Sequence, residues 1–495
     1  MGLIGADVDE LRRLARELST GAQQLDAATQ GLTAALFAAP WIGDGADRYR
    51  HDWTTTHRQR LAAATAALTQ AASLLDREAG EHQDASAPGA GLGGGGIAAG
   101  PVTPAPAPPR RGTPADNADW WRSLSPAQQR QVIADHPEWV GNRDGVPAWA
   151  RDEANRSRIE GERARLLAER DRLKEQLAGQ RSRQWFGDLV GDAMTDDDEK
   201  LASVEDKLAS LDAVDEVLGR GDRQLLVLDL DGKRAKAAVA VGDVDTAQNV
   251  AVFTPGLTTT VPSKLRGYDN DMDALVELAE QRSQAEGSDD RTAAVTWIGY
   301  EAPQWSETLD PRRSVISSHQ AQVGGDALAS FFTGINASRS DDVHLTALGH
   351  SYGSTTTGMA LQHDGTGVDD AVFFGSPGLG TSDVDDLHLA PGHAFVIEAR
   401  RDPVADLARF GGDPNLLPGV THLSATAGTA PDGTQLKEST GHSDYLAGSS
   451  TSQYNMAAVV TGHPETGIGG VGLGLGDALR FELDPVGGVR PWVLP

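Results

Sequence analysis

Hydrophobic residues recur every three or four positions in two runs along the first 75 residues of the chain. The first run comprises Val8, Leu11, Ala15, Leu18, Ala22, Leu25, Leu32 and Leu36, and the second comprises Ala46, Tyr49, Trp53, Leu61, Ala64, Leu68 and Leu75. This spacing predicts two amphipathic helices. Because only residues 40–45 separate them, the helices should pack antiparallel. We therefore expect a helical hairpin over residues 1–85.

A Trp-x-Gly motif, formed by Trp41 and Gly43, lies in the turn between these predicted helices. In this respect the segment resembles the WXG100 family, small helical hairpins that are exported by type VII secretion. The resemblance implies a WXG100-type helical partner, or self-association through residues 1–85. We expect the protein to be either cytoplasmic or secreted by a type VII-like route. The export signal of that family, a Tyr followed four residues later by Asp or Glu, is absent from this sequence.

The next two segments are predicted to be a linker and a helical leader. Residues 86–118 consist largely of Gly, Ala and Pro, so they offer little to bury and should form a linker. Residues 119–222 should be helical, with Ser125 and Pro126 as the N-cap and first residue of a short helix. Two charged helices follow, and their apolar positions are Ile159, Leu166, Leu173 and Leu177, then Leu201, Val204, Leu208, Leu211 and Leu218. We expect these two helices to pack as a hairpin on the next domain.

From Gln224 onward the hydrophobic pattern becomes that of β-strands. Residues 225–230 and 235–241, joined by Asp231 and Gly232, predict a β-hairpin. Apolar runs typical of parallel strands follow at 250–253, 293–297, 343–348, 371–374 and 394–398. Helical stretches separate most of these runs. Residues 223–495 should therefore form an α/β domain with a mostly parallel sheet and helices on both faces.

The composition and net charge of the chain exclude several classes of function. The chain has 71 acidic and 43 basic residues, a net charge of −28, which would repel a nucleic acid. It has no Cys, so disulfides, thiolate metal sites and a cysteine nucleophile are excluded. The sequence contains no run of 18 apolar residues and does not begin with a basic stretch followed by an apolar one. We expect neither a membrane span nor a signal peptide.

A Gly-x-Ser-x-Gly motif, residues 349–353, follows the predicted strand at 343–348. Small residues follow the motif and would let a helix pack closely. In α/β hydrolases this motif is the nucleophile elbow, a strained strand-to-helix turn that carries the nucleophilic serine. We therefore predict Ser351 as the nucleophile, and the alternative is an ordinary glycine-rich turn.

A serine hydroxyl needs a base, and the base needs an acid that orients it and stabilises its charged form. In this fold the acid follows the serine in the chain, and the histidine follows the acid. Asp402 lies just beyond the carboxyl end of the predicted strand at 394–398, where α/β sheets gather their functional side chains. It is the expected acid, and Asp406 is the weaker alternative.

Three histidines follow Asp402 in the sequence: His422, His442 and His463. His422 falls within an extended run at 420–425, in which alternate side chains should point into the sheet, and His463 belongs to a stretch rich in Gly and Pro. His442 lies in a polar loop, where a side chain can reach the serine. We expect His442 to be the base.

Acyl transfer also needs N–H donors for the developing oxyanion. The residue after the nucleophile, Tyr352, should supply one backbone N–H. The loop after the predicted strand at 250–253 should supply the second, because Gly256 would let this loop bend and turn the Leu257 N–H toward the elbow.

Four motifs in this region carry a family resemblance: residues 252–256, 297–300, 349–354 and 375–378. They resemble the actinobacterial α/β-hydrolase family formerly called DUF1023. The resemblance spans residues 225–465, and residues 120–155 resemble the leader that such proteins often carry. It implies an α/β-hydrolase fold with a triad of Ser351, Asp402 and His442, and it implies no particular substrate.

Acidic residues at 269, 271, 273 and 280 match positions of a calcium-binding EF-hand loop, but Ala274 replaces the glycine that its sharp turn needs. We expect these acids to precede a helix that begins at Ala274.

The predicted function is a serine esterase that needs no cofactor and cleaves a carboxylic ester. Lipid, small ester, thioester and amide substrates are all compatible with these residues. Two alternatives remain: a non-catalytic, secretion-linked binding protein, and an exported effector or toxin that uses the same domain.

Overall fold

The computed structural model describes residues 105–184, 196–304, 317–402, 404 and 410–470, with Thr29, Thr33, Trp53, Thr54 and Arg58. The chain divides into two units, Met1–Gly100 and Pro101–Pro495. The predicted hairpin over 1–85 and residues 86–104 of the predicted linker lie outside the described residues, apart from the five single positions.

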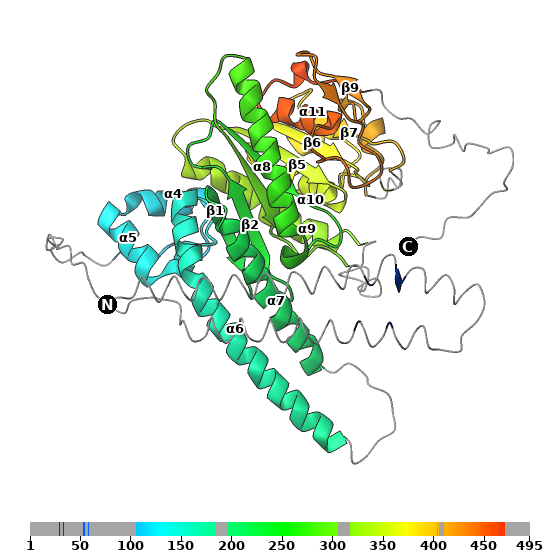
Figure 1. Ribbon diagram of the computed structural model, residues 1–495. Coiled ribbons are helices and arrows are strands. Elements are labelled where there is room, and N and C mark those ends of the chain that lie inside the picture. Colours follow the sequence, from blue (N-terminus) through cyan, green and yellow to red (C-terminus); the bar gives the residue numbers. More distant parts are fainter. Residues whose placement is uncertain are drawn as a thin grey trace, which may run out of the picture. The chain divides into compact units, whose positions relative to one another are not determined.

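The second unit is built around an eight-stranded sheet with the order β1-β2-β4-β3-β5-β6-β7-β8 (Figure 1). The strands are β1 (Arg223–Asp229), β2 (Lys236–Val241), β3 (Asn249–Thr254), β4 (Thr292–Ile298), β5 (His344–His350), β6 (Asp370–Phe374), β7 (Ala394–Ile397) and β8 (Thr421–Leu423). β2 pairs antiparallel with β1 and β4, and the other neighbours pair parallel. The predicted β-hairpin and each predicted parallel strand are therefore confirmed. A separate two-stranded sheet joins β9 (Gly428–Thr429) and β10 (Gln435–Leu436).

Helices cover both faces of the large sheet. They are α8 (Val261–Ala285), α9 (His319–Ser338), α10 (Tyr352–Leu361) and α11 (Thr451–Val460). On one face, alternate residues of β3 such as Val250 and Val252 pack with Phe332 of α9. On the other, Ala251 and Phe253 pack with residues of α8 and α11. Every residue of β3 and β4 is buried, which explains why these strands appear as continuous apolar runs.

The leader consists of α4 (Pro114–Ser123), α5 (Pro126–Asp135), α6 (Ala148–Gln184) and α7 (Asp196–Leu218). Ser125 caps α5 by accepting a hydrogen bond from the Gln128 N–H, as predicted. α4 begins inside the segment predicted as linker, because Thr113 and Asp116 form a capping box. The two charged helices pack on the sheet as expected, and Leu211 of α7 shares a core with β1 and β2.

Polar side chains of the leader cover the outer edge of β1. The Asn142 side-chain amide donates to the Leu228 carbonyl and accepts from its N–H, both at 2.8 Å. Asp152 accepts from the Leu225 N–H at 2.7 Å, and Asn155 donates to the Leu225 carbonyl at 3.0 Å. An edge strand with free backbone groups invites pairing with another chain, so these contacts protect the sheet.

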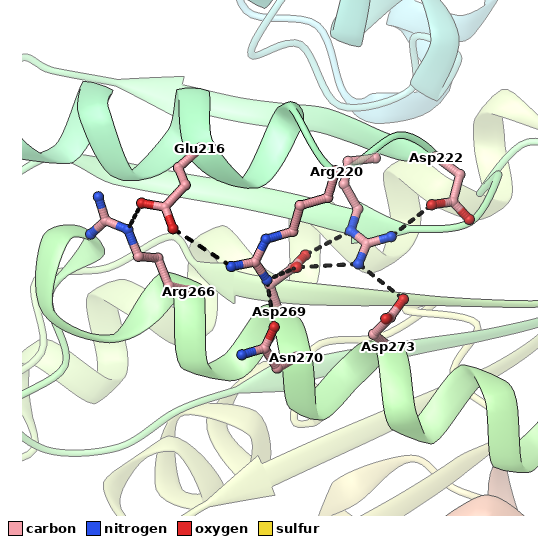
Figure 2. A network of polar contacts seen from close by, with 8 residues as sticks. Glu216, Arg220, Asp222, Arg266, Asp269, Asn270 and Asp273 are labelled. Atoms are coloured by element: carbon pink, nitrogen blue, oxygen red, sulfur yellow. Dashed lines mark hydrogen bonds and ion pairs between the residues drawn. The ribbon is translucent and has the colours of Figure 1, made fainter. Parts of the chain in front are cut away.

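An ion-pair network centred on the buried Asp269 joins β1 and the residues after α7 to α8 (Figure 2). Arg223 Nε lies 2.9 Å from Asp269 Oδ1, and Arg220 Nη1 lies 2.9 Å from Asp269 Oδ2. Arg223 also contacts Asp273 at 2.9 Å. The expectation of a helix beginning at Ala274 is wrong, because α8 starts at Val261 and these acids lie within it. Their partners come from β1 and the end of α7, which the local sequence does not reveal.

Within the described segments, no helix has both the length and the apolar character needed to cross a membrane.

Candidate active site

Ser351 lies at the sharp turn between β5 and α10, with φ of 55° and ψ of −132°. A positive φ is strained for a residue with a side chain, and such strain is typical of a nucleophile elbow. The turn also needs both flanking glycines. A Cβ on Gly353 would lie 2.1 Å from the Thr254 carbonyl oxygen, and one on Gly349 would lie 2.7 Å from the Ser354 Cα. The side chain of Ser351 is thereby held at the carboxyl end of β5.

The structure brings Ser351, His442 and Asp402 together from distant parts of the chain. His442 Nε2 lies 2.8 Å from Ser351 Oγ. His442 Nδ1 lies 2.9 Å from both carboxylate oxygens of Asp402. Since an ionised carboxylate only accepts, Nδ1 carries the hydrogen and Nε2 is free to accept one from the serine.

Asp402 is almost fully buried, yet its charge is well compensated. Tyr445 Oη donates to Asp402 Oδ2 at 2.7 Å, and the Val404 N–H donates to Oδ1 at 2.9 Å. Burial alone would raise the pKa of Asp402, but hydrogen bonds from His442, Tyr445 and Val404 outweigh it and hold this pKa below its usual value. Asp402 is therefore an anion that can stabilise a charged imidazole.

Gly375, in the motif at 375–378, makes room for this arrangement. Its φ is 56°, and a Cβ there would lie 2.8 Å from Asp402 Oδ2 and 3.2 Å from His442 Cε1. Any larger residue would press on the acid and the imidazole together.

The loop between β3 and α8 lies directly against the elbow. A Cβ on Gly256 would lie 2.6 Å from the Ser351 Cβ and 3.0 Å from its Oγ, so only glycine fits at this approach. Leu257 follows in the same loop and packs on the core. Tyr352 is the first residue of α10, so its N–H has no acceptor within the helix. Both residues predicted to supply oxyanion donors thus belong to segments that adjoin Ser351.

The other histidines considered from the sequence have different partners. His422 lies in β8 and its Nε2 is 2.9 Å from the Asn415 carbonyl oxygen. His463 pairs with Glu286 at 3.3 Å and with Glu465 at 3.2 Å. Asp406 lies outside the described residues.

Sequence reasoning missed two residues of the site, Tyr445 and His350. Tyr445 lies three residues after His442, and its ring is fully buried. His350 immediately precedes the nucleophile, and its Nε2 lies 2.8 Å from the carbonyl oxygen of His442. For Tyr445 the available signal was a large aromatic residue in an otherwise polar loop, and for His350 it was an aromatic residue inside the elbow motif.

The sheet order, together with a serine at positive φ between β5 and α10, defines an α/β hydrolase. A family model described as alpha/beta hydrolase matches residues 231–412. Uncharacterized protein Rv0963c of Mycobacterium tuberculosis is 37% identical over 236 residues, which are 46% of this chain and 86% of that protein. The chain belongs to this α/β-hydrolase family, so the expected hydrolase resemblance is confirmed at that level.

Uncharacterized protein Rv2079 of the same species is 30% identical over 375 residues, or 70% of this chain and 55% of that protein. The chain thus spans about half the length of this longer relative. Among solved structures, it is similar to a dienelactone hydrolase from Anabaena variabilis, at 14% identity and a TM-score of 0.29 over 50% of this chain and 99% of the other. An esterase from Pyrobaculum calidifontis is 13% identical, with a TM-score of 0.31 over 54% of this chain and 93% of the other.

Proposed function

We propose that the protein is a serine hydrolase that cleaves a carboxylic ester, with lipid-like esters among the possible substrates. The single observation that carries this proposal is the position of His442, which lies 2.8 Å from Ser351 Oγ and 2.9 Å from Asp402. This is the arrangement in which an imidazole can take a proton from a hydroxyl while a carboxylate stabilises the resulting charge.

The proposed reaction has two halves. His442 takes the Ser351 proton as Oγ attacks the ester carbonyl, and it then gives this proton to the departing alcohol as the C–O bond breaks. Water, deprotonated by His442, next attacks the acyl carbon on Ser351. As the bond between this carbon and Oγ breaks, His442 returns the proton to Oγ and the carboxylic acid leaves. In both halves the oxyanion would be held by the backbone N–H groups of Tyr352 and Leu257. No step needs a cofactor.

The test is replacement of Ser351 with Ala, assayed with a panel of esters graded in acyl length and with a fluorophosphonate probe. We expect hydrolysis to fall by at least about 1,000-fold and labelling to disappear. Ser340→Ala is the matched control, because Ser340 is an exposed serine in the loop before β5. Hydrolysis that survives in Ser351→Ala would reject the proposal.

We also propose the domain division expected from the sequence, with one boundary corrected: a hairpin over 1–85, a linker from 86 that ends before α4 begins at Pro114, a leader from α4 to 222 and a catalytic domain over 223–495. The hairpin would bind a WXG100-type partner or a second copy, and such a partner would accompany export by a type VII-like route. Light scattering of the full chain and of a chain starting at Pro101 tests self-association. If the full chain has the mass of a monomer, as the shorter chain should, binding of a second copy is excluded.

A further inference from the structure

His350, the last residue of β5, packs against three aromatic rings. Its ring stacks on Phe374 of β6, with ring centres 5.2 Å apart, and the two residues are partners in the β5–β6 register. The ring centre of Tyr445 lies 5.8 Å away and that of His442 lies 4.8 Å away. The parallel pairing of two strands therefore determines where this imidazole lies.

Among the described residues, the His350 ring has one hydrogen bond, which goes to the main chain of His442. His350 Nε2 lies 2.8 Å from the His442 carbonyl oxygen. A carbonyl only accepts, so Nε2 carries the hydrogen and donates it. On the other side of His442, the Gly441 N–H donates to the Arg400 carbonyl at 3.1 Å. The backbone is thus held both before and after the residue that contacts Ser351.

His350 keeps no charge at neutral pH. Burial, the neighbouring His442 and the charge of Lys264 lower the pKa of His350 to about 4, against the opposing effects of the His442 carbonyl and Asp402. A neutral ring can lie beside His442 without opposing the positive charge that His442 gains during proton transfer.

We propose that His350 is a positioning residue: its Nε2–H holds the main chain of His442 so that the imidazole of His442 stays between Ser351 and Asp402. This inference rests on the proposed function, since it concerns the same site. His350 itself touches none of the three reacting groups through its hydrogen bond, so it acts only through the placement of His442.

Three substitutions separate the hydrogen bond from the bulk of the ring. In His350→Gln, the side-chain amide nitrogen is as many bonds from Cα as Nε2 of histidine, so the donor is retained. In His350→Asn the donor is one bond too short, and in His350→Phe the ring remains but the donor is lost. A displacement of about 1 Å at a catalytic group can lower a rate by about 100-fold. We expect kcat to fall about 10- to 100-fold in His350→Phe and His350→Asn with KM little changed, and His350→Gln to recover most of kcat.

The experiment measures kcat, KM and the rate of fluorophosphonate labelling for the full chain and each variant, with melting temperature as the check on folding. Should His350→Phe fail to fold, the comparison of Gln with Asn decides. Equal kcat values in Gln and Asn, or a Phe variant as active as the wild type, would overturn the role of His350. A wild-type protein that neither labels nor hydrolyses esters would instead refute the proposed function.

Discussion

Tyr445 Oη lies 2.7 Å from Asp402 Oδ2 and donates a hydrogen bond to the carboxylate that also contacts His442. The same phenolic oxygen accepts the Ala399 N–H at 2.9 Å, which fixes the direction of the donated hydrogen. Burial and the charge of Asp402 raise the pKa of Tyr445, so its hydroxyl keeps its proton and remains a donor at neutral pH. A buried acid is thereby stabilised as an anion by a residue outside the proposed triad.

Replacing Tyr445 with Phe should destabilise the protein by about 1–3 kcal/mol at pH 7, because it removes a donor from a buried carboxylate. The pKa of Asp402 is lowered in the folded protein, so its stabilising contribution is present above its ordinary value of 3.8 and is lost as pH falls through the lowered pKa. The difference between variant and wild type should therefore shrink at acid pH. Urea unfolding from pH 7 to pH 3 measures it.

Tyr454→Phe is the control for that series, because the Tyr454 ring packs on Arg282, at 4.3 Å, rather than on Asp402. If the stability lost in Tyr445→Phe stays constant over the whole pH range, the loss does not come from the contact with the Asp402 carboxylate.

Gly353→Ala should disrupt the elbow, because the added Cβ would lie 2.1 Å from the Thr254 carbonyl oxygen and 2.7 Å from that of Pro255. Overpacking against backbone costs about 1–3 kcal/mol and displaces the loop that carries Leu257. We expect a lower melting temperature and much slower fluorophosphonate labelling.

Gly267→Ala provides the matched control for the elbow variant. Gly267 lies within α8 with open space around its Cβ position. Because Ala favours helices over Gly by about 1 kcal/mol, this variant should be slightly more stable than the wild type and should label normally. If Gly353→Ala matches Gly267→Ala in melting temperature and labelling rate, the elbow does not depend on the absence of a side chain at Gly353.

Asp269→Asn should destabilise the fold by about 3–5 kcal/mol, because two arginines lose their buried partner. The side chains of Asp269 and Arg223 are only 2% and 4% exposed. Asp273→Asn is the comparison: Asp273 contacts the same Arg223, but its side chain is 46% exposed and the loss should stay below about 1 kcal/mol. Urea unfolding of both variants at pH 7 measures the two losses, and equal losses would contradict the importance of burial.

His344→Gln should show a pH-dependent loss of stability. Burial would lower the pKa of His344, but Asp370, 3.1 Å away, and the Val459 carbonyl raise it above its ordinary value of 6.5. Its contribution is then fully present below pH 6.5 and is lost as pH rises through the raised pKa. We expect a deficit of about 1–3 kcal/mol at pH 5.5 that diminishes toward pH 9.

Thermal unfolding across this range tests the expectation for His344, with His363→Gln as control because His363 and its partner Asp326 are largely exposed. If the stability lost in His344→Gln instead grows as pH rises, the pKa of His344 is not raised in the folded protein.

Strand positions were predictable because each strand has its own apolar run. Residues 250–253 lie within β3 and 293–297 within β4, and both strands are buried throughout, so neither run depends on knowing its partner. The glycines at 349 and 353 likewise predicted a tight turn, because the need for a residue without a side chain shows in the sequence itself. The start of the helix that contains Asp269 was predicted wrongly. Asp269 pairs with two arginines that lie 46 and 49 residues away in the sequence, and the local pattern does not reveal them.

By itself, the sequence determined the alternation of strands and helices and the glycine-flanked serine turn, since these depend on periodicity and on steric limits within a few residues. Only the tertiary structure decided that His350 holds the main chain of His442 and that Tyr445 stabilises Asp402, across separations of 92 and 43 residues. A hydrogen bond depends on distance and direction in space, and those follow from how the strands and loops pack rather than from any local pattern.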